Sequence, residues 1–250
     1  MNLYKLSLKL KGFKIEKAIN ELKQLHSLSY EDYRILQDSK RNNIVQFHIE
    51  NNPFYRDRVG SSKFDSFEEL PIITKKDYQQ PLEKLLSKGY TTQNCYISNT
   101  SGSTGIPLYF AKDKDSHAFS HAVILYCYEQ WGINELSKQA RFYGIPLSGK
   151  SKYIEFLKDF LMNRKRFPVF DLSEEKMTSF LRSFEKKKFQ YLYGYTSAIV
   201  QFAKYLIKEQ IVLKNICPSL KCCIVTSEVC TEEDKAIMSQ AFSIPIVNEY

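Results

Sequence analysis

The chain has 250 residues, of which 43% are hydrophobic and 26% are charged, and its formal net charge is +8. This composition supports a sizeable buried core and excludes a disordered or fibrous protein. Because no run of about 18 apolar residues occurs, no membrane-spanning helix is expected. The positive charge fits a lysine-rich surface, or attraction to nucleotides, coenzyme A, nucleic acid or an anionic membrane.

The first 70 residues are predicted to form a helical N-terminal segment. Residues 1–14 are basic and mildly amphipathic, which suggests either a packed terminal helix or a peripheral contact with a membrane. A second helix is predicted over residues 30–49. Pro53 should end this pattern, because proline removes a backbone N–H and clashes with the preceding turn.

An α/β domain is predicted over residues 71–250. Thr74 is a candidate N-cap for the first helix of this domain. The predicted elements up to residue 131 are, in order, a helix over 75–86, strands over 94–98 and 108–111, and a helix over 117–131. A polar loop that contains glycine joins the two strands.

The last sixty residues alternate between strand-like and helical patterns. The predicted strands cover 189–193, 221–226 and 244–247, and the predicted helices cover 197–208 and 231–242, the second opened by a capping box. This order predicts an α/β fold with a doubly wound, mostly parallel sheet flanked by helices. Ligands of such sheets usually bind beyond the carboxyl ends of the strands. Those ends are residues 193–195, 226–228 and 248–250.

Six cysteines are present, and they show no zinc-site spacing. They are Cys95, Cys127, Cys217, Cys222, Cys223 and Cys230. Cys222 and Cys223 lie in an apolar, β-branched run, which predicts buried strand residues. Because no secretory signal is recognised, we expect a cytoplasmic protein with reduced thiols.

Two segments are candidates for binding phosphate. The first is the loop Thr100, Ser101, Gly102, Ser103, Thr104 and Gly105. Its glycines let the backbone approach an anion, and its amides and hydroxyls are donors. The same residue types also form ordinary hairpin loops.

The second candidate, Gly144–Ser151, matches the Walker A pattern of P-loop nucleotide hydrolases and kinases. Three features weaken this interpretation. The preceding strand is short and contains Arg141, although a Walker A strand is normally buried and apolar. Pro146 removes an amide donor from the loop itself. The following strand-like segment, 167–171, is broken by proline.

Beyond the first loop, five ordered elements resemble the adenylate-forming superfamily, and within it the phenylacetate–CoA ligase-like proteins of the branch linked to capsular polysaccharide biosynthesis. The loop itself is similar to the phosphate-loop signature of that superfamily. The five elements are Asn52–Arg56, Leu70–Lys75, Tyr191–Ser197, Thr226–Glu228 and Val247–Tyr250. They span nearly the whole chain, which makes them more specific than any single loop.

The resemblance implies a two-step reaction. A carboxylate attacks the α-phosphate of ATP to give an acyl-adenylate and pyrophosphate, and coenzyme A or another nucleophile then takes the acyl group. The small-molecule carboxylic acid, ATP, Mg²⁺ and coenzyme A would be the reactants and cofactors, and preorganised donors plus the metal would stabilise the phosphate charge. Nucleic acid is not an expected partner, and the oligomeric state is not predicted.

The resemblance also implies residue roles, all of them expectations here. The loop Thr100–Gly105 would bind the nucleotide phosphates. The adenine would contact Ser227, Glu228, Asn248, Glu249 and Tyr250. The acyl pocket would include Tyr193, Gly194 and Tyr195.

The chain departs from the family pattern in two respects. Ile106 stands where many members carry lysine. The sequence given also ends at Tyr250, so the catalytic lysine, the magnesium-binding glutamate and the mobile C-terminal domain are expected beyond it. No metal ligand is therefore predicted within the chain. We expect an incomplete N-terminal domain, inactive alone. The open alternatives are a P-loop NTPase or kinase that uses Gly144–Ser151, and a non-enzymatic basic module.

Overall fold

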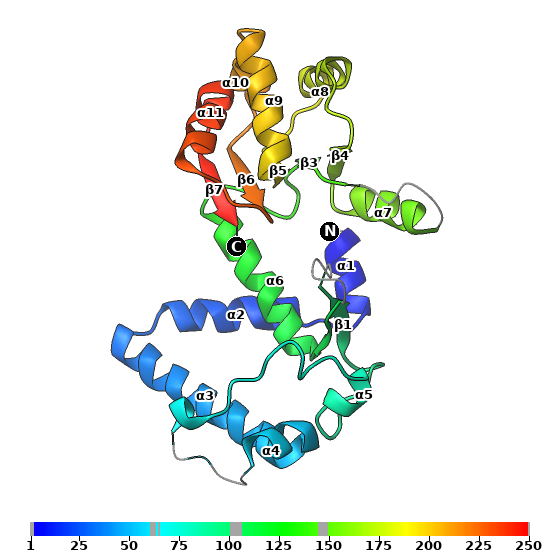
Figure 1. Cartoon of the computed structure of the whole chain (residues 1–250). Helices are drawn as coiled ribbons and strands as arrows, with labels where there is room; N and C mark the ends of the chain where they lie inside the picture. The colour runs from blue at the N-terminus through cyan, green and yellow to red at the C-terminus, as the bar shows by residue number, and fades with distance from the viewer. Residues whose placement is uncertain (1–2, 61–63, 65, 101–106, 145–149, 250) are drawn as a thin grey trace. The chain divides into compact units, whose positions relative to one another are not determined.

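The computed structural model describes residues 3–60, 64, 66–100, 107–144 and 150–249 (Figure 1). Packing divides the chain into two units. We call Leu8–Ile124 the N-terminal unit, and Leu125–Tyr250 together with Met1–Ser7 the α/β unit. Residue 70, where the sequence suggested a domain boundary, lies within the N-terminal unit. Each unit is described by itself below.

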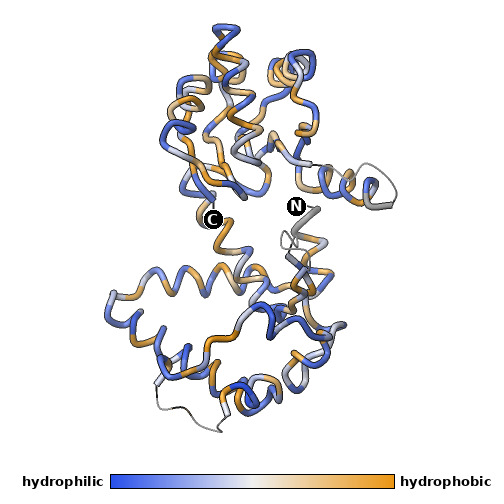
Figure 2. Tube along the Cα trace, in the orientation of Figure 1, coloured by the Kyte–Doolittle hydropathy of each residue, from blue (hydrophilic) through white to orange (hydrophobic). Residues whose placement is uncertain are grey.

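The first part of the chain is mainly helical. Its helices are α1 (Leu3–Leu10), α2 (Ile15–His26), α3 (Tyr30–Asn51), α4 (Pro53–Val59), the 3-10 helix η1 (Phe67–Glu69), α5 (Leu82–Leu85) and α6 (Lys114–Glu129). Apolar residues recur every three or four positions along α2, as in an amphipathic helix, and Ile15, Ala18 and Leu22 are buried (Figure 2). The predicted break at Pro53 is confirmed: the Asn52 side chain accepts a hydrogen bond from the Tyr55 amide and starts α4.

The helix predicted over residues 75–86 is wrong. Instead, the amide and hydroxyl of Thr74 donate hydrogen bonds of 2.8 and 2.7 Å to the Asp77 carboxylate within a single turn. Pro81 then supplies no backbone N–H, so only the short helix α5 forms after it.

A two-stranded hairpin follows in the N-terminal unit. Strand β1 (Tyr96–Asn99) pairs antiparallel with β2 (Tyr109–Lys112). The Thr100 amide donates to the Leu108 carbonyl at 3.0 Å, and the Leu108 amide donates to the Thr100 hydroxyl at 3.0 Å. These two bonds close the base of the connecting loop.

The α/β unit contains a five-stranded parallel sheet in the order β4-β3-β5-β6-β7 (Figure 1). Its strands are β3 (Gln139–Phe142), β4 (Arg164–Phe167), β5 (Tyr191–Tyr195), β6 (Cys222–Thr226) and β7 (Ile246–Glu249), and its helices after α6 are α7 (Lys150–Leu161), α8 (Glu174–Lys186), α9 (Thr196–Lys208), α10 (Leu213–Ile216) and α11 (Glu232–Phe242). The predicted α/β class with a parallel, helix-flanked sheet is confirmed.

One face of this sheet forms the hydrophobic core. Successive strand residues point to opposite faces, so Phe142, Phe167 and Leu192 meet the apolar sides of α8 and α9. The Phe142 and Phe167 rings stack at 5.0 Å between centroids. Full burial of each such ring stabilises the fold by about 1.5–3 kcal/mol. Cys222 and Cys223 are buried strand residues, as the sequence predicted.

The other face of the sheet is polar on β3 and β4. Arg164 and Arg166 on β4 are nearly buried, with side chains 6% exposed, and both form ion pairs with Asp159 and Glu155 of α7. These pairs attach α7 to the edge of the sheet. Arg141 of β3 lies on the same face because it pairs in register with Arg166.

Candidate functional site

The carboxyl ends of β5, β6 and β7 lie at one edge of the sheet, because the three strands are parallel neighbours. Tyr195 pairs with Thr226, and Thr226 pairs with Glu249. Three segments that the sequence singled out therefore end side by side. Ligands of open α/β sheets usually bind at such an edge.

Glu249, at the end of β7, accepts hydrogen bonds from two tyrosines. The Tyr193 hydroxyl donates to Oε1 at 2.9 Å, and the Tyr128 hydroxyl, from α6, donates to Oε2 at 2.5 Å. Burial, and then the charge of Glu249, raises the pKa of both tyrosine hydroxyls. Both therefore remain protonated donors at neutral pH and fix the orientation of the Glu249 carboxylate.

Glu228 lies beyond β6 and caps a neighbouring helix. Its carboxylate accepts hydrogen bonds from the Ser197 amide at 2.7 Å and from the Ser197 hydroxyl at 3.1 Å. Tyr195, the N-cap residue of α9, makes no side-chain capping bond, so Glu228 supplies the negative partner for this helix N-terminus. Ser227 precedes it with φ of 69°, a left-handed conformation that turns the chain sharply.

A shallow pocket of about 370 Å³ opens between the ends of β6 and β7. Its lining residues are Thr226, Ser227, Glu228, Val229 and Glu249. The volume is in the range of small-molecule sites. Three of the predicted adenine-binding residues, Ser227, Glu228 and Glu249, are thus brought together. Asn248 is exposed on the opposite side of β7, outside this lining, and Tyr250 lies outside the described residues.

The predicted acyl-pocket residues divide into a buried glycine and two tyrosines. A Cβ atom on Gly194 would stand 2.0 Å from the Phe142 carbonyl oxygen, so this position lets β5 approach β3 closely. Tyr195 stacks on Tyr143 with 4.2 Å between ring centroids, and Tyr193 lies 6.4 Å from the same ring. Two tyrosines of β5 therefore gather with Tyr143, the residue that directly follows β3.

The predicted phosphate loop belongs to the N-terminal unit. Thr100 closes the β1–β2 hairpin, as described above. Ser101, Gly102, Ser103, Thr104 and Gly105 lie outside the described residues. Their predicted role stays a prediction.

The surroundings of the Walker-like segment, Gly144–Ser151, agree with a P-loop in one respect and differ in another. The segment follows β3, an inner strand, and α7 begins at Lys150; residues 145–149 lie outside the description. P-loop enzymes also need an acidic residue on a nearby strand to hold magnesium. The strands beside β3 end at Phe167 and Tyr195, so neither described end presents a carboxylate.

Sequence reasoning missed four residues of this region. They are Tyr128, Arg141, Tyr143 and Ser197. Arg141 lies on β3, and Tyr143 follows that strand directly, two positions further on. In an extended segment this spacing places two side chains on one face, and it was a usable signal. Tyr128 and Ser197 gave no comparable signal, because their partners lie 121 and 31 residues away.

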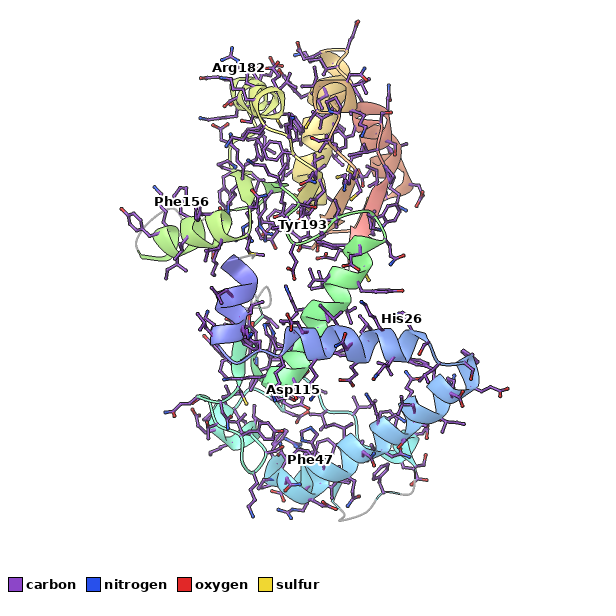
Figure 3. All side chains as sticks on the ribbon, turned by 180° about the vertical axis from the view of Figure 1, so that it is seen from behind. His26, Phe47, Asp115, Phe156, Arg182 and Tyr193 are labelled. Carbon is purple, nitrogen blue, oxygen red and sulfur yellow. The ribbon has the colours of Figure 1, made fainter. Side chains whose placement is uncertain are left out.

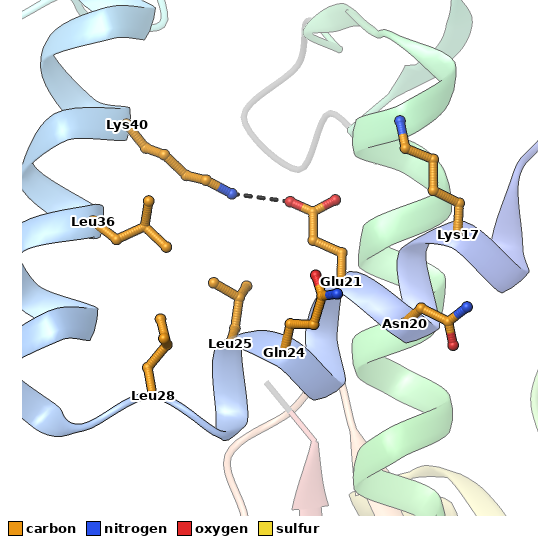
Figure 4. Close-up of a pocket in the computed structure, with 8 residues that line it drawn as sticks. All are labelled: Lys17, Asn20, Glu21, Gln24, Leu25, Leu28, Leu36 and Lys40. Atoms are coloured by element: carbon orange, nitrogen blue, oxygen red, sulfur yellow. Dashed lines mark hydrogen bonds and ion pairs between the residues drawn. The ribbon is translucent and has the colours of Figure 1, made fainter.

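The N-terminal unit contains a groove of about 730 Å³ between α2 and α3 (Figure 4). The Lys40–Glu21 ion pair of 2.9 Å crosses it, and Leu25, Leu28 and Leu36 line one end. Exposed ion pairs of this kind contribute little to the stability of the fold. We assign the groove no ligand. No group of three potential metal-binding side chains occurs among the described residues. Within the same residues, no helix is long and apolar enough to cross a bilayer.

Comparison with known proteins places this geometry in context. No model of a protein family matches the chain. Protein CapK of Staphylococcus aureus is 23% identical over 242 residues, which cover 92% of this chain and 52% of CapK. The chain thus spans about half the length of this curated relative.

Solved structures of 2-hydroxyisobutyryl-CoA ligase have a similar fold. An open conformation in complex with 2-HIB-AMP and CoA matches with a TM-score of 0.57 and 15% identity, over 89% of this chain and 54% of the ligase. A postadenylation state with R3-HIB-AMP matches with a TM-score of 0.61 and 15% identity, over 89% and 49%. The fold is therefore similar to that of 2-hydroxyisobutyryl-CoA ligase, in agreement with the fold that the sequence resemblance predicted.

Proposed function

We propose that the chain is the front part of an ATP-dependent ligase that activates a carboxylic acid as an acyl-adenylate and then forms a thioester with coenzyme A. The observation that carries this proposal is the pocket at the ends of β6 and β7, where Ser227, Glu228 and Glu249 converge. It lies at the strand edge where α/β sheets bind ligands, in a fold shared with a CoA ligase crystallised with an acyl-AMP and CoA.

The proposed roles follow from residue chemistry. Ser227, Glu228, Asn248, Glu249 and Tyr250 would surround the adenine, with hydroxyl, amide and carboxylate groups that can pair with its polar edge. Glu228 and Glu249 are already held by Ser197 and by two tyrosines. Because these side chains are already held in place, they lose little conformational entropy when a ligand binds.

The carboxylate of the acid would react at the α-phosphate, so the acyl group and the phosphates need separate contacts. The loop Thr100–Gly105 is proposed to contact the phosphates with amide and hydroxyl donors. Tyr193, Gly194 and Tyr195 are proposed to border the acyl group, because the stacked tyrosines provide a flat, largely apolar wall with polar tips.

Magnesium would accompany ATP through its phosphate oxygens. We assign no metal ligand within the described residues. The catalytic lysine is likewise assigned to no residue of this chain. Since the chain covers about half of its relatives, the complete reaction is a proposal about the whole gene product.

A role in surface polysaccharide biosynthesis is part of the proposal. The sequence resembles the capsular branch of the phenylacetate–CoA ligase-like proteins, and Protein CapK is the curated relative. A small-molecule acid would be the substrate and the cytoplasm the location, where ATP and coenzyme A are available. The basic residues 1–14 are proposed as a peripheral membrane contact.

Nucleotide binding by loop variants tests the proposal against its strongest rival. The P-loop alternative is favoured by one observation: α7, which starts at Lys150, is the next helix after the inner strand β3. In the complete gene product, Ser103→Ala with Thr104→Ala should weaken ATP binding by about tenfold or more, and Lys150→Ala should leave it within about twofold. The reverse pattern would support the P-loop enzyme and reject the ligase.

A further inference from the structure

Arg141 is a cation held inside the α/β unit without an acidic partner among the described residues. It lies on β3, between β4 and β5. Its Nε atom is buried and has no hydrogen-bond partner, and its Nη1 atom makes a long bond of 3.4 Å to Oε1 of Gln139. An unpaired buried donor destabilises a folded chain, so a native protein that retains one needs a reason for it.

The contrast with the neighbouring arginines makes this position unusual. Arg164 and Arg166 lie on the same face of the sheet, and both pair with Asp159 and Glu155. Arg141 forms no such pair within the described chain. Burial, and then the charge of Arg164, lowers the pKa of the Arg141 guanidinium, although arginine stays protonated in proteins. The surroundings of Arg141 therefore favour an incoming anion.

Aromatic rings fix the guanidinium in place. Its central carbon lies 4.4 Å from the ring centroid of Tyr143 and 4.8 Å from that of Tyr193. These cation–π contacts hold the planar group in one orientation. The same tyrosines stack with Tyr195 or lie beside it, so Arg141 adjoins the proposed acyl pocket; Figure 3 labels Tyr193 on β5.

We propose that Arg141 binds a second carboxylate of the acyl substrate, so that the enzyme activates a dicarboxylic acid. This inference rests on the proposed function. One carboxylate of the acid would react with ATP, and the other carboxylate of the same molecule would pair with Arg141. A guanidinium presents parallel N–H groups that match a carboxylate in two-point contact. Because Arg141 lies beside Tyr143 and Tyr193, next to the proposed acyl pocket, the anion it would meet is a carboxylate of the acid rather than a nucleotide phosphate.

Direct binding to the chain tests the anion site without any catalytic step. The Nε–H resonance of Arg141 is assigned by its loss in Arg141→Met and its retention in Arg182→Met, where Arg182 is an exposed arginine on α8 (Figure 3). Glutarate should shift this resonance saturably, and uncharged glutaramide should bind at least about tenfold more weakly. No shift, or equal shifts with both probes, would overturn the proposal.

Substrate preference in the complete gene product tests the dicarboxylate assignment. Pyrophosphate exchange is measured with the acids from malonate to adipate and with monocarboxylates of the same lengths. The wild type should favour one dicarboxylate by about 10- to 100-fold in kcat/KM, and Arg141→Met should remove that preference while monocarboxylates change less than about threefold. Equal losses for both classes would contradict a role in recognition.

Further results distinguish a failure of the proposed function from a failure of the dicarboxylate inference. The Arg182→Met control should keep the preference, and Arg141→Lys should retain part of it because the charge remains without the two-point geometry. If no acid supports exchange, the proposed function fails, but glutarate binding to wild-type Arg141 still decides the anion site. If exchange occurs with monocarboxylates alone, the proposed function stands and the dicarboxylate inference is rejected.

Discussion

The Tyr193 hydroxyl donates a 2.9 Å hydrogen bond to Oε1 of Glu249, and this bond joins β5 to β7 across the intervening strand β6. Tyr128 donates to the other oxygen of the same carboxylate. Glu249 is therefore the point where α6 and two strands meet. This arrangement fixes one wall of the pocket beside Ser227.

Removing the Tyr193 hydroxyl should destabilise the α/β unit. Tyr193→Phe leaves one oxygen of a charged, part-buried carboxylate without its donor, so the free energy of unfolding should fall by about 1–2 kcal/mol. Tyr153→Phe is the matched control, because Tyr153 is 77% exposed, and it should change stability by less than about 0.5 kcal/mol. Urea denaturation measures both, and equal effects would show that the bond contributes nothing.

A side chain at position 194 should be far less tolerated than one at an open glycine. The Cβ atom of Gly194→Ala would stand 2.0 Å from the Phe142 carbonyl oxygen, so β3 and β5 would have to separate at a cost of about 3 kcal/mol or more. Gly60→Ala is the control, because Gly60 has φ of 70° and no atom near its added Cβ. It should cost about 1–2 kcal/mol, from backbone strain alone. Similar thermal denaturation of the two variants would contradict the close approach.

Glu228 should stabilise α9 from outside the helix. Glu228→Ala removes the acceptor for the Ser197 amide and hydroxyl, so the free energy of unfolding should fall by about 1 kcal/mol. Glu185→Ala, at an exposed site on α8, should have little effect. If the Glu228 variant is as stable as the wild type in urea, its carboxylate does not cap the helix and is free to contact a ligand.

The capping box of α11 predicts a pH-dependent contribution to stability. Hydrogen bonds from the backbone and the side chain of Thr231 lower the pKa of Asp234 below its usual value. A carboxyl group with a lowered folded pKa stabilises the fold above its unfolded pKa, about 3.9, and loses this effect as the pH falls through the folded pKa. Asp234→Ala should therefore be less stable than wild type at pH 7, with a gap that closes in acid. A gap that does not vary with pH would refute this assignment.

The cysteines should differ in reactivity according to burial. Burial raises the pKa of the Cys222 thiol to about 11 and also raises the pKa of Cys223, whereas Cys127 is exposed. Because the thiolate is the reactive species, a disulfide reagent should label Cys127 in the native protein and the two strand cysteines only after unfolding. Cys127→Ser should remove the fast phase. Native labelling of Cys223 at the rate of Cys127 would contradict the buried sheet.

The sequence predicted those helices and strands whose signals lie within a few consecutive residues. The capping box at Thr231, the helix after Tyr195 and the apolar run at Cys222–Thr226 were all visible, and their β-α-β order implied the parallel sheet. The helix over 75–86 failed because Pro81 falls in its interior, where proline supplies no backbone N–H. Strand order and register also required the folded chain.

Prediction of the site was limited in a similar way. Ser227, Glu228 and Glu249 were identified by resemblance, and they do share one pocket. Their hydrogen-bond partners could not be foreseen, since Tyr128 lies 121 residues from Glu249 in sequence. In the sequence, Arg141 indicates only that its strand differs from the apolar strand of a Walker A site. Its significance depends on the register that aligns it with Arg166 and Tyr193.

Acid-dependent exchange of pyrophosphate into ATP by the complete gene product tests the central claim most directly. The account predicts exchange with at least one acid of a broad panel, and its loss in the Ser103→Ala, Thr104→Ala double variant. Failure to bind ATP, together with no exchange for any acid, would contradict the assignment of this fold to acyl-adenylate chemistry.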